Sequence, residues 1–156
     1  MLLKLVHLAQ IIMAAYGAVQ SRAAISKLLE YEDATKKLAK VSSEAAHQLH
    51  ETRTTQASGA AALLVSLVVS ALLAAGYGVG GVQYLASPVM ALGVYAARAH
   101  LQNFWAGRDG EGVKVPLPKM GAYNEAVERT LKSLEVLGWL TMSWVVSSAL
   151  ALTEGY

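Results

Sequence analysis

Charged residues are missing from three long stretches of the chain, and the apolar residues in these stretches do not alternate with polar ones. The longest stretch runs from 54 to 97 and contains no Asp, Glu, Lys or Arg. Crossing a bilayer takes about 20 apolar residues, so this stretch is long enough for two spans. The glycine-rich segment 76–81 divides it and predicts a tight turn between two helices. We therefore expect spans at about 58–77 and 83–105.

Two more uncharged stretches, 5–21 and 136–153, flank this pair and predict spans at about 4–22 and 132–153. Backbone groups in lipid must be hydrogen-bonded within the segment, which favours helices, and runs such as 63–69 lack the alternation of a β-barrel. The pattern predicts one all-α domain, residues 1–156, folded as an integral membrane four-helix bundle with up-down-up-down topology. The first stretch could instead be a signal peptide, because Lys4 precedes its apolar run.

The basic residues predict how the bundle lies in the membrane. Of the 13 Lys and Arg residues, only Lys4 lies on the side of the termini. The others lie in the polar loops 23–57 and 106–131 or at the adjoining helix ends. The positive-inside rule then places both loops in the cytosol and both termini in the lumen, in the endoplasmic reticulum or another organelle membrane.

The two polar loops differ in their expected structure. A weak apolar stripe in 23–57 predicts that the first helix runs past the membrane, turns near Tyr31–Thr35 and is followed by a second polar helix. Glycine and proline exclude a continuous helix through 107–121, and a helix can begin from about Tyr123.

Composition narrows the function classes. Apolar residues make up 54% of the chain and charged residues 15%, against about a quarter in soluble domains, so an ordinary cytosolic enzyme is excluded. The net charge of +2 is too small to indicate a nucleic acid partner. Without cysteine there is no disulfide or thiolate chemistry. The expected partners are the lipid bilayer and either further copies of the chain or other membrane subunits, because small residues four apart allow close helix contact.

The end of the third span carries most of the candidate chemistry. Arg98 lies seven residues before Trp105, which suits the membrane interface, and is therefore about 10 Å deeper along a helix. A charge at that depth indicates a functional site. Arg98 either binds an anionic ligand or has a structural role, snorkelling to the headgroups or pairing with Glu135 at the start of the fourth span.

The neighbouring polar residues complete a candidate site. His100 could act as a general acid or base, because its pKa lies near neutrality. His47 and His50 have a spacing that can bind a metal, but no supporting motif accompanies them, so no metal site is predicted. We assign candidate catalytic roles to Arg98, His100 and Glu135, and candidate substrate-binding roles to Arg22, Arg53, Gln102, Asn103 and Trp105.

The end of the third span carries the segment 94–98 (Val-Tyr-Ala-Ala-Arg) followed by the aromatic pair Phe104 and Trp105, and Arg22 lies near the end of the first span. With the four-span topology, these features resemble a known family, the membrane-associated proteins in eicosanoid and glutathione metabolism (MAPEG). The resemblance implies a trimer of four-helix subunits, with glutathione as a possible cofactor. The family's second helix carries Arg-x-x-x-Asn-x-x-Glu for glutathione, whereas here Arg53 is followed by Ala57 and Ala60 at those offsets.

Two main functions remain open on the sequence. The first is a membrane enzyme (transferase, isomerase or cyclase) acting on a lipophilic small molecule at the cytosolic face, with Arg98 binding an anionic group. The second is a non-catalytic accessory or assembly subunit of a larger membrane complex. A transporter is a third reading, but no broken helix pair with charged midplane residues supports it.

Overall fold

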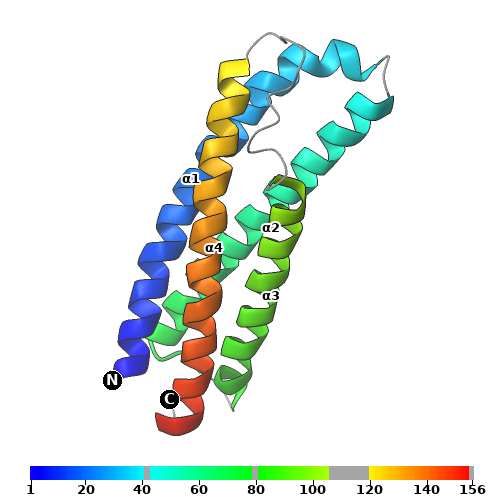
Figure 1. Cartoon of the computed structure of the whole chain (residues 1–156). Helices are drawn as coiled ribbons and strands as arrows, with labels where there is room; N and C mark the ends of the chain where they lie inside the picture. Colours follow the sequence, from blue (N-terminus) through cyan, green and yellow to red (C-terminus); the bar gives the residue numbers. More distant parts are fainter. Residues whose placement is uncertain (41–42, 79–80, 106–119, 155–156) are drawn as a thin grey trace.

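The computed structural model describes residues 1–40, 43–78, 81–105 and 120–154. These residues form four helices: α1 (Leu2–Ala39), α2 (Ser43–Ala74), α3 (Val82–Trp105) and α4 (Met120–Glu154). Successive helices run in opposite directions, and the two termini lie at the same end of the bundle (Figure 1). The predicted all-α, up-down-up-down arrangement is confirmed.

The helices pack in a ring, in chain order. α1 packs against α2 and α4, and α3 packs against the same two helices, so that α1 and α3 lie diagonally opposite. The largest fully buried side chains fill the centre between them: Leu63, Leu101, Trp105, Leu137, Leu140 and Trp144. The middle of the bundle is thus occupied by side chains from three of its helices.

Among the described residues, three helices are long and apolar enough to cross a membrane by their length and composition, over Leu2–Asp33, Ala46–Ala74 and Gly121–Thr153. The outer surface of the bundle is also apolar on every helix, α3 included. Exposed aliphatic side chains include Leu8, Ile12, Val19, Leu64, Val68, Leu72, Leu85, Val89, Leu92, Val145, Val146 and Leu152. A contiguous surface of this kind is unfavourable in water and suits the hydrocarbon of a bilayer.

The predicted turn between the second and third helices is present, and backbone hydrogen bonds explain it. Gly76 has a φ of 81°, which a residue without a Cβ adopts readily. Its N–H bonds to the carbonyl of Leu73 at 3.1 Å, and the N–H of Tyr77 bonds to the carbonyl of Leu72 at 2.9 Å. This pair of bonds is the Schellman motif, which ends α2.

The prediction of a turn near Tyr31–Thr35 is wrong, because α1 continues through these residues to Ala39. Charged residues did not stop the helix, since Glu, Lys and Ala are good helix formers and Glu32 is held by a bond to α2. The polar loops expected at 23–57 and 106–131 are correspondingly helical over 23–39, 43–57 and 120–131. The expected helix start near Tyr123 is confirmed within a turn, at Met120.

An apolar layer crosses the bundle at the level of Gly17. It consists of Ala14 and Gly17 on α1, Leu63 on α2, and Leu137 and Leu140 on α4, all of them buried. The contact is tightest at Gly17, where an added Cβ would lie 2.6 Å from Leu63 Cδ2 and 2.9 Å from Val136 Cγ1. A glycine therefore sets the distance between α1 and its two neighbours at this level.

Candidate functional site

Arg98 lies on the buried face of α3. The buried residues of this helix are Ser87, Ala91, Val94, Leu101 and Trp105. They are spaced alternately by four and three residues except for one gap of seven, and Arg98 fills that gap. Residues spaced in this way share one face of a helix. The guanidinium of Arg98 therefore lies on the face of α3 whose other residues pack into the bundle.

Arg98 contacts α4 at Gly138. A Cβ added to Gly138 would lie 3.2 Å from Arg98 Nε and 3.7 Å from Cζ, so the glycine leaves the space in which the guanidinium lies. The Nε atom is buried and has no hydrogen-bond partner. Within the described part of the chain, Arg98 forms no ion pair within 4.0 Å. A desolvated donor on a cation is costly to leave unpaired, so this position favours an anion.

The residues around this contact form a strip that changes from polar to apolar. On α3, Tyr95 and Gln102 lie three residues before and four after Arg98, which places them on the same side. On α4, Glu135 and Met142 stand in the same relation to Gly138. We call these six residues the α3–α4 seam (Tyr95, Arg98, Gln102, Glu135, Gly138 and Met142).

The direction of the helices orders the seam. Because α3 and α4 are antiparallel, Gln102 and Glu135 lie toward the end of the bundle away from the termini, whereas Tyr95 and Met142 lie toward the middle. All four are exposed, Tyr95 to 57% and Met142 to 61%. The seam thus presents polar groups, a guanidinium and then apolar surface, in that order.

The predicted ion pair between Arg98 and Glu135 is not formed. Glu135 lies within one turn of Gly138, which contacts Arg98, but the side chain of Glu135 is exposed. The rotation of α4 is fixed by its neighbours Leu134, Val136 and Leu137, which are all buried. Glu135 therefore lies at the polar end of the seam, and its assigned catalytic role stays a prediction.

The other predicted site residues do not converge on Arg98. His100 is exposed and lies two residues from Arg98, a separation that places it on a different face of α3. Asn103 is exposed, and Arg22 is exposed on α1, the helix diagonal to α3. Of the eight candidates, the seam brings together Arg98, Gln102 and Glu135.

Two of the remaining candidates are engaged in structural contacts. Trp105 is fully buried, and its Nε1 donates to Thr55 Oγ1 on α2 at 3.1 Å. Arg53 donates to both carboxylate oxygens of Glu32, with Nε 3.1 Å from Oε2, and ties α2 to α1. Beside this pair, a hydrogen bond to Asp33 raises the pKa of Lys36 above its usual range.

A buried polar cluster near the termini was not predicted from the sequence. His7 Nδ1 lies 2.8 Å from Gln10 Oε1, Gln10 Nε2 donates to Ser147 Oγ at 3.1 Å, and Ser70 Oγ donates to Gln10 Oε1 at 3.1 Å. Nearby, Trp144 Nε1 donates to Ser66 Oγ at 3.3 Å. We call these residues the His7 cluster (His7, Gln10, Ser66, Ser70, Trp144 and Ser147). The spacing of His7 and Gln10, three residues apart, was the signal available.

No group of three or more His, Cys, Asp or Glu side chains within the described ranges could hold a metal ion. His47 lies 3.8 Å from Glu51 at the exposed start of α2, as expected for a solvated pair. The chain was also compared with protein-family models, with curated proteins and with solved structures, and none of the three comparisons found a match.

Proposed function

We propose that this protein binds a singly charged, amphiphilic anion at the α3–α4 seam, with Arg98 as the contact to its charged group. The observation that carries the proposal is the buried, unpartnered Nε of Arg98 over Gly138. A guanidinium offers paired donors to a carboxylate or a phosphate. The apolar stretch beyond it, at Tyr95 and Met142, suits a hydrocarbon chain.

The charge of the ligand follows from the seam. Arg98 is its single cation, and Glu135 stands at its polar end. A doubly charged group would be repelled by Glu135 once Arg98 was neutralised, whereas a group with one negative charge is balanced by Arg98 alone. The ligand class is therefore a monoanionic headgroup on a hydrocarbon chain, either a fatty acid type carboxylate or a phosphodiester lipid.

The binding role agrees with the first part of the enzyme hypothesis, in which Arg98 holds an anionic group. Glu135 is the residue we propose for proton transfer if a reaction follows binding, since it stands on the same strip. A MAPEG-like role with glutathione would need Arg53 to leave Glu32, to which it is bound here. The seam therefore supports a lipophilic ligand better than glutathione.

Binding can be measured on the purified protein in a mild, uncharged detergent with a fluorescent C16 fatty acid. We expect Arg98→Gln to weaken binding about tenfold or more, the cost of losing a hydrogen bond to a charged group. Lys132→Gln is the matched control, because it removes one positive charge from α4 at a residue already paired with Glu128. Competition by phosphatidylglycerol separates the phosphodiester from the carboxylate.

Two results would remove the proposal. One is equal affinity in the Arg98→Gln and Lys132→Gln variants. The other is binding of the uncharged methyl ester of the fatty acid as tightly as the acid itself, which would show that the anion is not what the protein recognises.

A further inference from the structure

Tyr16 is an exposed tyrosine of α1 that lies within the apolar part of the bundle. Its side chain is 51% exposed, and the nearest charged residues on either side of it in the helix are Lys4 and Arg22. Arg22 is about 9 Å away along the helix and Lys4 about 18 Å. Side chains lean toward the N-terminus of their helix, so Tyr16 leans away from the level of Arg22. Its hydroxyl is therefore at the depth of hydrocarbon chains.

Trp139 on α4 lies at nearly the same height. Gly17, beside Tyr16, packs against Val136, and Trp139 follows Val136 by three residues. Because α1 and α4 are antiparallel, Trp139 lies about 3 Å nearer the termini than Tyr16. Its side chain is 63% exposed.

Both side chains carry a hydrogen-bond donor. Within the part of the chain that the structure describes, neither Tyr16 Oη nor Trp139 Nε1 forms a hydrogen bond. Hydrocarbon chains offer no acceptor, so an unpaired donor at this depth is unfavourable. The two donors therefore indicate a partner outside the chain.

Tyr16 lies beside the contact between α1 and α4. One turn after it, Gln20 Oε1 accepts from Arg129 Nη1 at 2.9 Å. Seven residues after Gln20, Lys27 Nζ lies 3.5 Å from Glu125 on α4. Residues spaced by four and seven share one side of a helix. Tyr16 therefore continues the side of α1 that meets α4.

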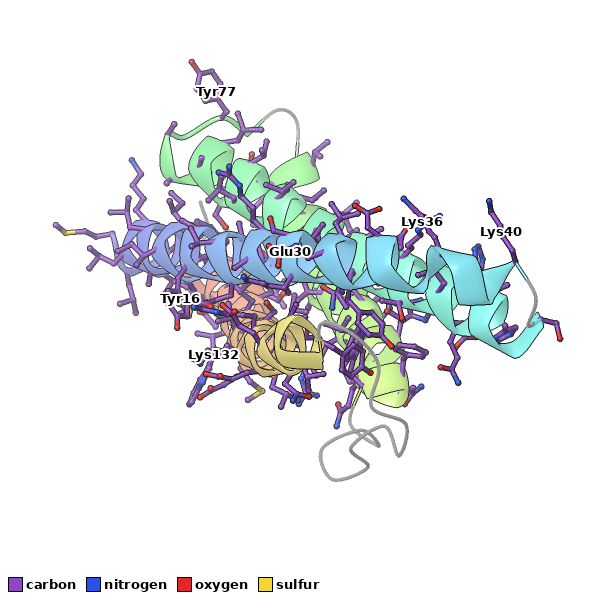
Figure 2. All side chains as sticks on the ribbon, turned by 90° about the horizontal axis from the view of Figure 1, so that it is seen from above. Tyr16, Glu30, Lys36, Lys40, Tyr77 and Lys132 are labelled. Atoms are coloured by element: carbon purple, nitrogen blue, oxygen red, sulfur yellow. The ribbon has the colours of Figure 1, made fainter. Side chains whose placement is uncertain are left out.

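The same side of α4 carries Lys132 and Trp139. They follow Arg129 by three and ten residues, a spacing that keeps them on one face of the helix. Figure 2 shows Tyr16 and Lys132 on the same side of the two helices. We call these residues the α1–α4 face (Tyr16, Gln20, Lys27, Arg129, Lys132 and Trp139).

The charges at the polar end of this face are balanced. Lys27 and Arg129 lie 3.5 Å and 3.8 Å from Glu125, and Lys132 lies 2.8 Å from Glu128. All of these side chains are partly or largely exposed. Because both signs occur at nearly the same height, two such faces can meet without net repulsion.

We propose that the α1–α4 face binds the same face of a second copy of this chain, in a dimer whose two-fold axis runs along the membrane normal. Such an axis places equal residues of the two copies at equal height, so Tyr16 meets the partner's Tyr16. A hydroxyl both donates and accepts, so the two tyrosines can bond to each other. The second lone pair of each hydroxyl can accept from the indole of Trp139.

The dimer leaves the α3–α4 seam exposed and does not depend on a ligand there. Val136, which packs against Gly17, faces α1, whereas Gly138, which contacts Arg98, faces α3. The two surfaces therefore lie on different sides of α4, and each can be tested without the other.

Association can be measured by energy transfer in phosphatidylcholine vesicles at decreasing ratios of protein to lipid. The labels are attached through Lys40→Cys, an exposed position in a chain that contains no cysteine. Tyr16→Phe removes only the hydroxyl and should weaken association about threefold to tenfold, the effect of a hydrogen bond between helices in a membrane. Tyr95→Phe, 57% exposed on α3, is the matched control and should associate like the unaltered protein in the absence of ligand.

Two results of this measurement would overturn the dimer. One is equal association of the Tyr16→Phe and Tyr95→Phe variants. The other is unaltered protein that stays monomeric at every ratio, which would point to a small lipophilic molecule with an acceptor group as the partner of Tyr16.

A second measurement keeps Tyr16 and serves if Tyr16→Phe does not fold. Ile12→Cys lies one turn before Tyr16 and is 71% exposed, so oxidation in vesicles should join two copies through a disulfide. Leu64→Cys is the control, because it is 54% exposed on α2 and lies beside Leu63, which packs at the height of Gly17. Equal yields of cross-linked dimer from the two variants contradict the proposal.

Discussion

At the residue scale, two glycines allow close contacts between helices inside the bundle. Gly17 lets α1 approach Leu63 and Val136, and Gly138 leaves room for the guanidinium of Arg98. By contrast, a Cβ added at Gly93, on the exposed side of α3, would meet nothing within 4 Å. The same residue type therefore has a packing role at two positions and none at the third.

Gly17→Ala is expected to destabilise the bundle by about 1–3 kcal/mol, the usual cost of overpacking, because its Cβ would overlap the side chains of Leu63 and Val136. Gly93→Ala should be neutral or slightly stabilising, because alanine is the better helix former. Unfolding of both variants in detergent gives the comparison. Equal stabilities would mean that the contact at Gly17 is not tight.

Sequence reasoning found Arg98 but not its environment. The depth of Arg98 followed from its distance to Trp105, and the spacing of the apolar residues around it could also have placed it on the inner face of α3. The pair with Glu135 could not be judged, because the rotation of α4 depends on which of Leu134, Val136 and Leu137 face inward, and all three are apolar. The His7 cluster was missed because Gln10, which bonds to His7, has its other partners Ser70 and Ser147 at 60 and 137 positions away in the chain.

At the scale of the elements, the turn between α2 and α3 was predictable and the course of α1 was not. A glycine with positive φ ends α2, and glycine marks such positions in any sequence. The charged segment after Glu30 contains no glycine, and a turn was predicted near Tyr31–Thr35 from its polarity alone. The helix is held there by Glu32, whose side chain is only 6% exposed and is bound by Arg53 from α2.

Arg53→Gln should loosen this end of α1, because it leaves the buried carboxylate of Glu32 without its main partner. Arg53 itself is largely exposed, so the expected cost is modest. Hydrogen exchange of the backbone amides of residues 28–39 should become about fivefold faster.

The double variant Glu32→Gln, Arg53→Gln is the control for this pair, because it removes the uncompensated charge together with its partner. It should recover part of the protection in residues 28–39. If the double variant exchanges faster than Arg53→Gln alone, the ion pair is not what holds the helix.

The two ends of the bundle differ in charge: lysines lie at the end away from the termini, and the turn after α2 lies at the same end as the termini. Figure 2 shows Lys36 on the far part of α1, Lys40 directly after its end, and Tyr77 at the turn that follows α2. Lys40 and Tyr77 are both exposed, Tyr77 to 72%. In the predicted topology Lys40 faces the cytosol, and Tyr77 faces the lumen together with both termini.

Single cysteines can test this arrangement without background, because the chain contains none. In sealed microsomes, Lys40→Cys should react with a membrane-impermeant maleimide from outside, and Tyr77→Cys should react only after the membrane is opened. Reaction of both residues from the same side would contradict a bundle that spans the bilayer.

The apolar layer at Gly17, Leu63, Leu137 and Leu140 has an electrical consequence. It separates the His7 cluster from the polar contacts of Glu32, Arg53, Thr55 and Gln56, and the fixed positive charge of Arg98 lies at almost the same height, against Gly138. The described side chains of this layer carry no hydroxyl, amide or charge. The layer therefore isolates the two polar clusters from each other, and a change of charge in one is not passed to the other along side-chain hydrogen bonds of these residues.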